Sequence, residues 1–208
     1  MTSEASVKSA VKKVKEHPIL FSTPMIKAIL AGKKTQTRRV VKPQPDNDGG
    51  WTSCTSVHDH NIVEFCPYSQ PSDRLWVRET WWKDQSGGLW GYKADGIDWP
   101  PTNCGGKAIP SIFMPRWVSR ITLEITDIRV QRVQEISRVD THAEGILRFD
   151  RDNPDVNGGV GYNRGAPNLP MRYESLAAYE DLWDSINRKK YPWASNPWVW
   201  AITFKVLK

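Results

Sequence analysis

Two long stretches of the chain alternate apolar and polar residues with a period of two, the pattern of a strand with one buried face. They span residues 120–133 and 198–206. The first stretch changes phase near Asp127, which predicts a bulge or a bend. Shorter strand signals occupy residues 35–41, 75–82 and, more weakly, 89–93. The pattern predicts a protein built around a β-sheet.

Helical signals fill three of the intervals between these strands. Thr23 as the N-cap and Pro24 as the first helical residue begin a helix that Gly32 ends. Ser137 caps a short helix, with Asp140 at the capping-box position and Gly145 near its end. A third helix, residues 173–187, carries an apolar stripe at helical spacing: Leu176, Tyr179, Leu182, Trp183 and Ile186.

The order of these elements predicts an α+β protein with a curved mixed sheet or small β-barrel, and not a parallel α/β fold. Residues 42–72 and 148–171 are rich in Pro, Asp, Asn and Gly, so we expect two long inserted loops. A further loop is expected over residues 95–111. We expect residues 1–17 to form a basic, solvated extension and residues 18–208 to form a single domain with insertions.

Composition narrows the class of partner. The chain has 208 residues, of which 39% are apolar and 25% charged, and it holds no apolar run long enough to cross a membrane. Eleven tryptophans and a net charge of +6 favour a partner with bases or phosphates. The three cysteines are too few and odd in number for a disulfide framework, and the N-terminus lacks the apolar core of a secretion signal. A cytoplasmic protein is therefore expected.

Reactive side chains gather first where the helix beginning at Thr23 gives way to a strand. In an ordinary strand Lys34 would face away from Thr37 and Arg39, whereas a turn at Lys34 would let all three converge. A desolvated lysine can have a pKa near neutrality and can activate a threonine hydroxyl. A solvated basic strand is the alternative interpretation.

A second candidate is Glu144, at the end of the short helix beside Gly145. A carboxylate gains nothing from the helix dipole at that end, so a lysine partner elsewhere would explain its position. The alternative is an exposed glutamate at a helix end. His142, two residues earlier, is expected at the surface.

The third segment, residues 73–82, interleaves aromatic and charged residues. Period-two alternation places Trp76, Arg78 and Trp82 on one face of a strand, with Tyr92 nearby in sequence. Aromatic rings between arginines can stack bases and pair with phosphates, so these four residues are candidates for substrate binding. Buried tryptophans with surface arginines are the alternative.

No cofactor is predicted. Four soft donors lie close together in sequence, but their spacing is not that of a usual zinc site: Cys54, His58, His60 and Cys66. The chain also contains no phosphate-binding glycine motif. We therefore expect neither a metal nor a nucleotide cofactor.

The string Gly32-x-Lys34-x-x-Thr37-x-Arg39, directly after a helix, resembles the signature of the ASCH domain, a relative of the PUA fold. Small bacterial members that hydrolyse N4-acetylcytidine carry a similar string and, after a long strand, a helix that ends in a glutamate. The resemblance implies that Lys34, Thr37 and Glu144 form a catalytic trio that works without metal.

Over residues 18–206 the chain is similar to the longer ASCH proteins carried by phages and prophages. The segments that carry this likeness are Thr37-Arg38-Arg39, Cys66-Pro67-Tyr68, residues 73–80, residues 114–117 and residues 196–200. The resemblance implies a PUA-like α+β fold.

The reaction implied is removal of the acyl group from an N4-acylated cytosine, so the partner is a small modified pyrimidine nucleoside or base. Lys34 would take the proton of Thr37, or Thr37 would orient a water, while Glu144 orients Lys34 or protonates the leaving amine. Arg39, or a main-chain N–H of residues 32–35, would stabilise the oxyanion. We expect Lys34→Ala and Glu144→Ala to abolish acetate release with the fold intact. The alternative implied by the same resemblance is an RNA-binding module, with or without ribonuclease activity.

Overall fold

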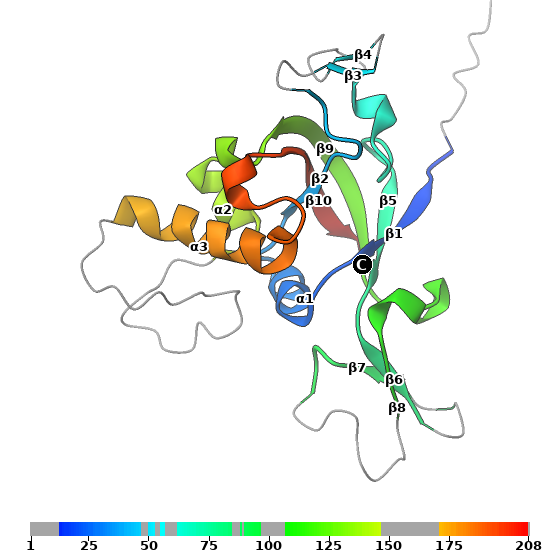
Figure 1. Ribbon diagram of the computed structural model, residues 1–208. Helices are drawn as coiled ribbons and strands as arrows, with labels where there is room; N and C mark the ends of the chain where they lie inside the picture. Colours follow the sequence, from blue (N-terminus) through cyan, green and yellow to red (C-terminus); the bar gives the residue numbers. More distant parts are fainter. Residues whose placement is uncertain are drawn as a thin grey trace, which may run out of the picture.

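The computed structural model describes residues 13–46, 50–52, 55–56, 62–84, 88, 90–96, 107–146 and 171–207. Its main element is a five-stranded mixed sheet (Figure 1). The strands, in spatial order, are β1 (Glu16–Leu20), β5 (Arg74–Arg78), β9 (Thr122–Arg132), β10 (Trp198–Leu207) and β2 (Gln36–Val40). β1 and β5 are parallel and the other pairs antiparallel, so the α+β class is confirmed.

Two small sheets and three α-helices complete the described elements. The small sheets are β3 (Gly50–Thr52) with β4 (Thr55–Ser56), and β6 (Trp81–Lys83) between β7 (Trp90–Tyr92) and β8 (Lys107–Ile109). The helices are α1 (Thr23–Leu30), α2 (Arg138–Ala143) and α3 (Met171–Asn187). Short 3₁₀ turns occupy Ile62–Phe65, Ser111–Phe113, Arg116–Val118, Val133–Glu135 and Trp193–Ser195.

The sheet is covered on both faces, which gives two apolar clusters. On one face Ile26 and Ile29 of α1 pack against β5, β9 and the inward residues Trp200 and Ile202 of β10. On the other face α3 packs Tyr179, Leu182 and Trp183 against Val199 of β10. β10 alternates between the clusters because successive side chains of a strand point to opposite faces. The edge strand β2 therefore lies between α1 and α3.

The two long alternating stretches form the longest strand pair, β9 with β10. Their register shifts between Thr203 and Phe204, opposite Asp127 and Ile125, so one residue of β9 is left unpaired. The bulge expected near Asp127 is thereby confirmed.

The prediction of one strand over residues 75–82 was wrong. β5 ends at Arg78, and β6 begins at Trp81 in a different sheet, with the buried Glu79 between them. Both faces of the main sheet are covered, so Leu75, Trp76 and Val77 are all buried. Alternation of apolar and polar residues therefore could not show where this strand ends.

Helix ends follow their sequence signals with one correction. The N-cap of α1 is Ser22 and not Thr23, and its side chain makes no capping hydrogen bond. In α2 the Ser137 hydroxyl accepts a 3.1 Å hydrogen bond from the main-chain N–H of Asp140, as expected.

The loop and extension boundaries also differ from the sequence prediction. Residues 42–72 contain β3, β4 and a 3₁₀ turn, and β8 lies within 95–111. The sequence predicts a solvated extension up to residue 17, but Glu16 and His17 belong to β1 and pair with β5. The N-terminal twelve residues, and residues 147–170, which hold nearly all of the second expected loop, lie outside the described residues. Among the helices described, none is long and apolar enough to cross a membrane.

Candidate active site

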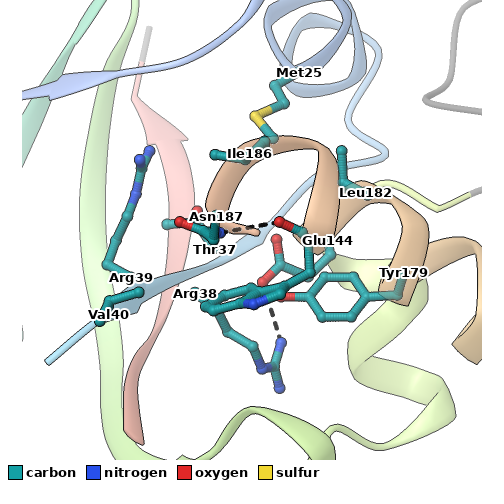
Figure 2. Close-up of a pocket in the computed structure, with 11 residues that line it drawn as sticks. Met25, Thr37, Arg38, Arg39, Val40, Glu144, Tyr179, Leu182, Ile186 and Asn187 are labelled. Carbon is teal, nitrogen blue, oxygen red and sulfur yellow. Dashed lines mark hydrogen bonds and ion pairs between the residues drawn. The ribbon is translucent and has the colours of Figure 1, made fainter. Parts of the chain in front are cut away.

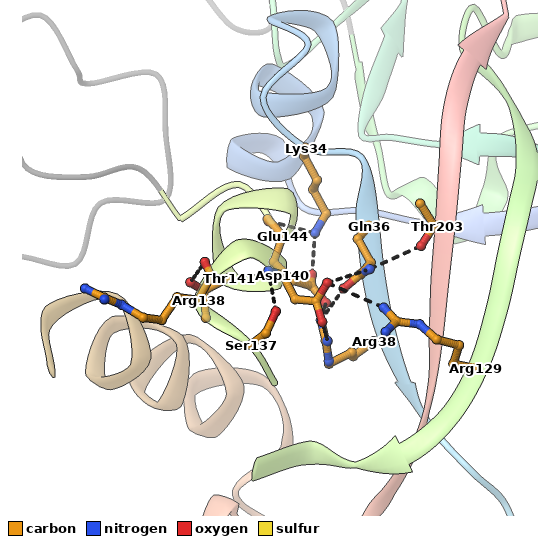
Figure 3. A network of polar contacts seen from close by, with 10 residues as sticks. All are labelled: Lys34, Gln36, Arg38, Arg129, Ser137, Arg138, Asp140, Thr141, Glu144 and Thr203. Carbon is orange, nitrogen blue, oxygen red and sulfur yellow. Dashed lines mark hydrogen bonds and ion pairs between the residues drawn. The ribbon is translucent and has the colours of Figure 1, made fainter. Parts of the chain in front are cut away.

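The end of α2 meets the start of β2 through a buried ion pair. Lys34 Nζ donates to Glu144 Oε2 at 2.6 Å and to the main-chain oxygen of Glu144 at 2.8 Å (Figure 3). Lys34 is fully buried and Glu144 is 3% exposed. The two residues also form an isolated β-bridge, so the backbone itself holds them side by side. The lysine partner expected for Glu144 is present.

Gly145 explains why the chain can make this approach. Its φ of +90° lies in the region that favours glycine, and a Cβ there would lie 3.3 Å from the Cβ atoms of Ala28 and Lys34. A side chain at this position would therefore push α2 away from Lys34. The glycine that ends the helix in the sequence also sets the position of Glu144.

Further charges extend the ion pair into a network. Arg38 donates from Nη1 to Glu144 Oε1 at 3.2 Å and from Nη2 to Asp140 Oδ2 at 2.9 Å. Gln36 binds Asp140 and also accepts from Arg38. Two cations thus face two carboxylates, which balances the charge where solvation is lost. Figure 3 shows these groups converging between β2 and α2.

Burial controls the protonation of this network. Desolvation lowers the pKa of Lys34 below its usual value, although the charge and hydrogen bond of Glu144 oppose the shift. An amine of lowered pKa close to a carboxylate can pass a proton to it at little cost. The pair is therefore suited to hold and return a proton.

A small cavity of about 70 Å³ opens between β2, α1 and α3, with Glu144 in its wall (Figure 2). One water needs about 10–15 Å³ of such space, so the cavity holds roughly five waters, which is about the size of a single pyrimidine ring. The other lining residues are Met25, Thr37, Arg38, Arg39, Val40, Tyr179, Leu182, Trp183, Ile186 and Asn187.

Thr37 contributes a hydroxyl to this cavity. The residue is 3% exposed, and within the part of the chain that the structure describes its hydroxyl makes no hydrogen bond. Lys34 is absent from the cavity lining, so Glu144 is the member of the pair that a ligand would meet. The structure brings Lys34 together with Glu144, and Glu144 with Thr37, around one cavity.

Tyr179 is a site residue that the sequence did not reveal. It is buried in the cavity wall, and burial together with the negative charge of Glu144 raises its pKa well above the usual value, while Arg38 opposes the shift. A phenol that stays protonated keeps its O–H as a hydrogen-bond donor for a carboxylate or ligand oxygen beside it. The sequence pattern placed Tyr179 in the apolar stripe of a helix. Its phenol hydroxyl was the only sequence signal that could have indicated a polar role.

Arg38 and Asp140 were also missed as members of the network. The sequence indicated Arg38 only as part of the family-like segment Thr37-Arg38-Arg39, and Asp140 only as a capping residue. Their pairing joins residues that are 102 positions apart, so no local pattern contains it.

Arg39 lies in the cavity wall as expected, and its guanidinium is only partly engaged, because its buried Nε has no hydrogen-bond partner among the described residues. Nη2 donates to the main-chain oxygen of Leu20 at 2.6 Å, and the group lies 5.1 Å from the ring centroid of Phe21. The other oxyanion donors suggested by the sequence, the main-chain N–H groups of residues 32–35, are excluded because they are already bonded. The N–H groups of residues 32–35 all donate to main-chain oxygens, over 2.8–3.1 Å.

The four residues expected to hold the base are not in this cavity. The Arg78 guanidinium lies 4.7 Å from the ring of the buried Trp76. Trp82 covers Gly91 within the sheet β7-β6-β8, and Tyr92 donates from its hydroxyl to the main-chain oxygen of Val118. In Figure 1 that sheet lies at the bottom of the view, apart from α3, which lies at mid-height on the left.

The described residues hold no cluster of three or more potential metal ligands. Cys66 is buried, and burial raises the pKa of its thiol to about 11. The other three residues weighed as zinc ligands, Cys54, His58 and His60, lie outside the described residues.

No family model matches the chain, and no curated protein matches it. Among solved structures, the chain is similar to an ASCH domain from Lactobacillus crispatus JV V101 at 9% sequence identity and a TM-score of 0.40. The alignment covers 92% of this chain and 79% of that chain. An identity and a score this low carry no argument about activity, which depends on the site geometry.

Proposed function

We propose that the protein is a hydrolase that removes the acyl group from N4-acylated cytosine or cytidine. The observation that carries this proposal is the buried pair of Lys34 and Glu144, whose carboxylate shares a base-sized cavity with the unbonded hydroxyl of Thr37. A nucleophile, a proton acceptor and a group that orients the acceptor are the parts that acyl transfer requires.

The resemblance of residues 30–39 and Glu144 to ASCH amidohydrolases supports the same three residues. We infer that the chain is a long, phage-type ASCH protein, since the motif lies at the junction of helix and strand where the likeness would put it. The space in the cavity also favours a single pyrimidine over a polynucleotide.

In the proposed reaction, Thr37 Oγ1 attacks the acyl carbon and its proton passes to the Glu144 and Lys34 pair. The bond from the acyl carbon to N4 then breaks, and the pair returns the proton to the leaving amino group of cytosine. Water hydrolyses the acetyl ester of Thr37 by the same proton path, which releases acetate. In the close variant, water attacks directly and Thr37 orients it.

The burial of the ion pair changes which variants are suitable. Alanine at Glu144 would leave the buried Lys34 without its anion, and alanine at Lys34 would leave a cavity where its side chain was. Both would destabilise the fold, in contrast to the earlier expectation of an intact fold. Lys34→Met removes the amine while Arg38 still pairs with Glu144. Glu144→Gln keeps a side chain of the same shape.

The test is incubation of the purified protein with N4-acetylcytidine, with cytidine and acetate measured by chromatography. The wild type should release both, and Lys34→Met and Glu144→Gln should release neither above background. Wild-type protein that leaves the substrate unchanged would contradict the proposal.

A second candidate function, binding of single-stranded RNA, is favoured by a separate surface. Trp117 is 69% exposed and packs edge-on against Trp90 at 5.7 Å. Beside it, the guanidinium groups of Arg78 and Arg116 lie 4.7 and 6.0 Å from the ring centroid of Trp76, and Arg78 donates to the main-chain oxygen of Ile112. Exposed rings next to arginines can stack bases and neutralise phosphates.

This second candidate is tested by titrating labelled oligouridine at increasing salt. Binding that weakens steeply with salt and falls about tenfold or more in Trp117→Ala would support it. Binding that is absent, or equal in the variant, would contradict it, and capture of acetylated nucleoside alone would favour the hydrolase.

A further inference from the structure

We infer that the open edge of β2, the main chain of Arg38 and Val40, binds the amide-bearing edge of the substrate. This inference rests on the proposed function and adds the groups that read the ligand. β2 is an end strand of the five-stranded sheet, and only β10 pairs with it among the strands described. The other edge of β2 faces the cavity, which Arg38 and Val40 line.

The register of β2 fixes which main-chain groups point to the cavity. Phe204 N–H donates to the Thr35 oxygen at 2.8 Å, and Val41 N–H donates to the Trp198 oxygen at 3.0 Å. In an antiparallel pair every second residue bonds to the partner strand, so residues 37 and 39 do as well. The N–H and C=O groups of Arg38 and Val40 therefore point away from β10.

Those groups are open main-chain donors and acceptors of the site, and the buried Nε atoms of Arg38 and Arg39 also lack a partner among the described residues. The N–H groups of residues 32–35 are used within the backbone, and Nη2 of Arg39 is held by the main-chain oxygen of Leu20. Within the described ranges, the structure shows no bond from another element to the main chain of Arg38 or Val40. A buried main-chain group without a partner is costly, so a polar ligand or water must satisfy it.

Strand geometry assigns a different role to each donor. With a rise of about 3.3 Å per residue, the N–H groups of Arg38 and Val40 lie roughly 6.6 Å apart, so a single oxygen cannot bind both. The N–H of Arg38 directly follows Thr37, so it is the donor beside the acyl carbon that Thr37 attacks, where negative charge develops on oxygen. The C=O of Arg38 and the N–H of Val40 are then left for a donor and an acceptor on the base.

The opposite wall suits a flat ring. Leu182 and Ile186 of α3 line the cavity across from the edge of β2, as Figure 2 shows. An apolar wall facing a row of main-chain donors and acceptors holds a planar heterocycle by its face and its edge. An added peptide strand needs room for alternating side chains, which a cavity of about 70 Å³ does not provide.

The experiment uses proline to delete one main-chain donor. At an edge strand, proline is tolerated where the N–H points away from the sheet, so Val40→Pro removes only the outward donor. Val40→Ala is the matched control that keeps the N–H. For N4-acetylcytidine we expect KM to be about tenfold higher in Val40→Pro than in Val40→Ala, because both variants lose the valine side chain and only the proline variant also loses the N–H. Equal KM values in the two variants would overturn the inference.

A second measurement does not depend on folding of the proline variant or on turnover. In the isotope-labelled wild type, the amides of Arg38 and Val40 should exchange with solvent faster than those of Thr37 and Arg39. Saturating cytidine should shift and protect the Arg38 and Val40 amides. Cytidine that leaves both amides unchanged would overturn the inference.

The two proposals fail in distinguishable ways. If cytidine protects the Arg38 and Val40 amides but the wild type releases no acetate, the hydrolase proposal fails while the recognition edge stands. If acetate is released and Val40→Pro matches Val40→Ala, the hydrolase proposal stands while the recognition edge fails.

Discussion

Among the residues that the structure describes, two glutamates are buried, and the difference between them separates a candidate site from a structural ion pair. Glu144 is 3% exposed and pairs with Lys34 and Arg38, while Glu79 is 2% exposed and pairs with Arg120 through two contacts of 2.9 and 3.1 Å. By burial and pairing alone the two carboxylates are nearly equivalent.

Their surroundings differ in what remains unsatisfied. Arg120 binds both oxygens of Glu79, donates to Asp95 at 2.6 Å and lies 4.0 Å from the ring of Tyr92, so this cluster joins the small sheet to the end of β5. Glu144 instead borders a cavity that also holds an unbonded hydroxyl and an unpaired strand edge. A buried charge therefore indicates chemistry only where unsatisfied groups surround a space for a ligand.

The largest expected effect is on activity, when each glutamate is replaced by its amide. Glu144→Gln should lower kcat for N4-acetylcytidine by about 10³-fold, because the proton acceptor at the cavity is lost. Glu79→Gln should stay within about twofold of the wild type. Steady-state kinetics measure both, with circular dichroism as the control for folding. Equal losses in the two variants would remove the distinction between the clusters.

Stability should not distinguish the two glutamates. Glu144→Ala and Glu79→Ala each leave a cation without its buried partner, so each should lower the free energy of unfolding by about 3–5 kcal/mol. Urea unfolding monitored by tryptophan fluorescence gives the two values. A Glu144→Ala protein as stable as the wild type would show that the ion pair does not hold α2 against β2.

The pH dependence of activity should reflect Lys34. Desolvation lowers its pKa, so the amine becomes neutral at a lower pH than an ordinary lysine. Because Glu144 takes the proton at the cavity and passes it to the neutral amine of Lys34, kcat should rise with pH through the lowered pKa of Lys34 and reach its plateau below the usual range of lysine. A rate that still rises above pH 10.5, the ordinary value, would contradict this assignment.

The smallest effect is expected at the partly exposed edge of the network. Although burial raises the pKa of Asp140, the charge of Arg38 and the hydrogen bond of Gln36 lower it overall. The stabilisation by Asp140 is therefore present above its ordinary value of 3.8 and is lost as pH falls through the lowered pKa. Asp140→Asn should cost about 1 kcal/mol at pH 7 and less at acid pH, as measured by urea unfolding at both. A cost that does not change with pH would contradict it.

Local sequence signals anticipated the fold where one face of an element is buried. The bulge near Asp127, the cap at Ser137 and the closing strand followed from period and capping chemistry. The break after Arg78 did not, because strands buried on both faces lose their alternation. Element order was sufficient for the α+β class, but sheet membership depended on contacts distant in sequence.

For the site, the sequence supplied the residues of one motif but not their surroundings. Lys34, Thr37 and Glu144 carried chemical signals, namely a glycine-ended helix and a carboxylate without a helix-dipole benefit. Tyr179 carried only its phenol group within an apolar stripe, and the β2 edge carried no signal, since a helix stripe and a strand edge acquire polar roles only after α3 packs. The base-binding prediction for Trp76 and its neighbours relied on alternation that the fold does not keep.

The most direct test of the central claim is the rate of cytidine formation from N4-acetylcytidine by the wild type, Thr37→Ser and Thr37→Val. The valine variant keeps the shape of the cavity wall and removes only the hydroxyl, and serine restores it. We expect rapid formation by the wild type, retained activity in Thr37→Ser and a loss of about 10³-fold or more in Thr37→Val. A valine variant as active as the wild type, or a wild type without activity, would contradict the account.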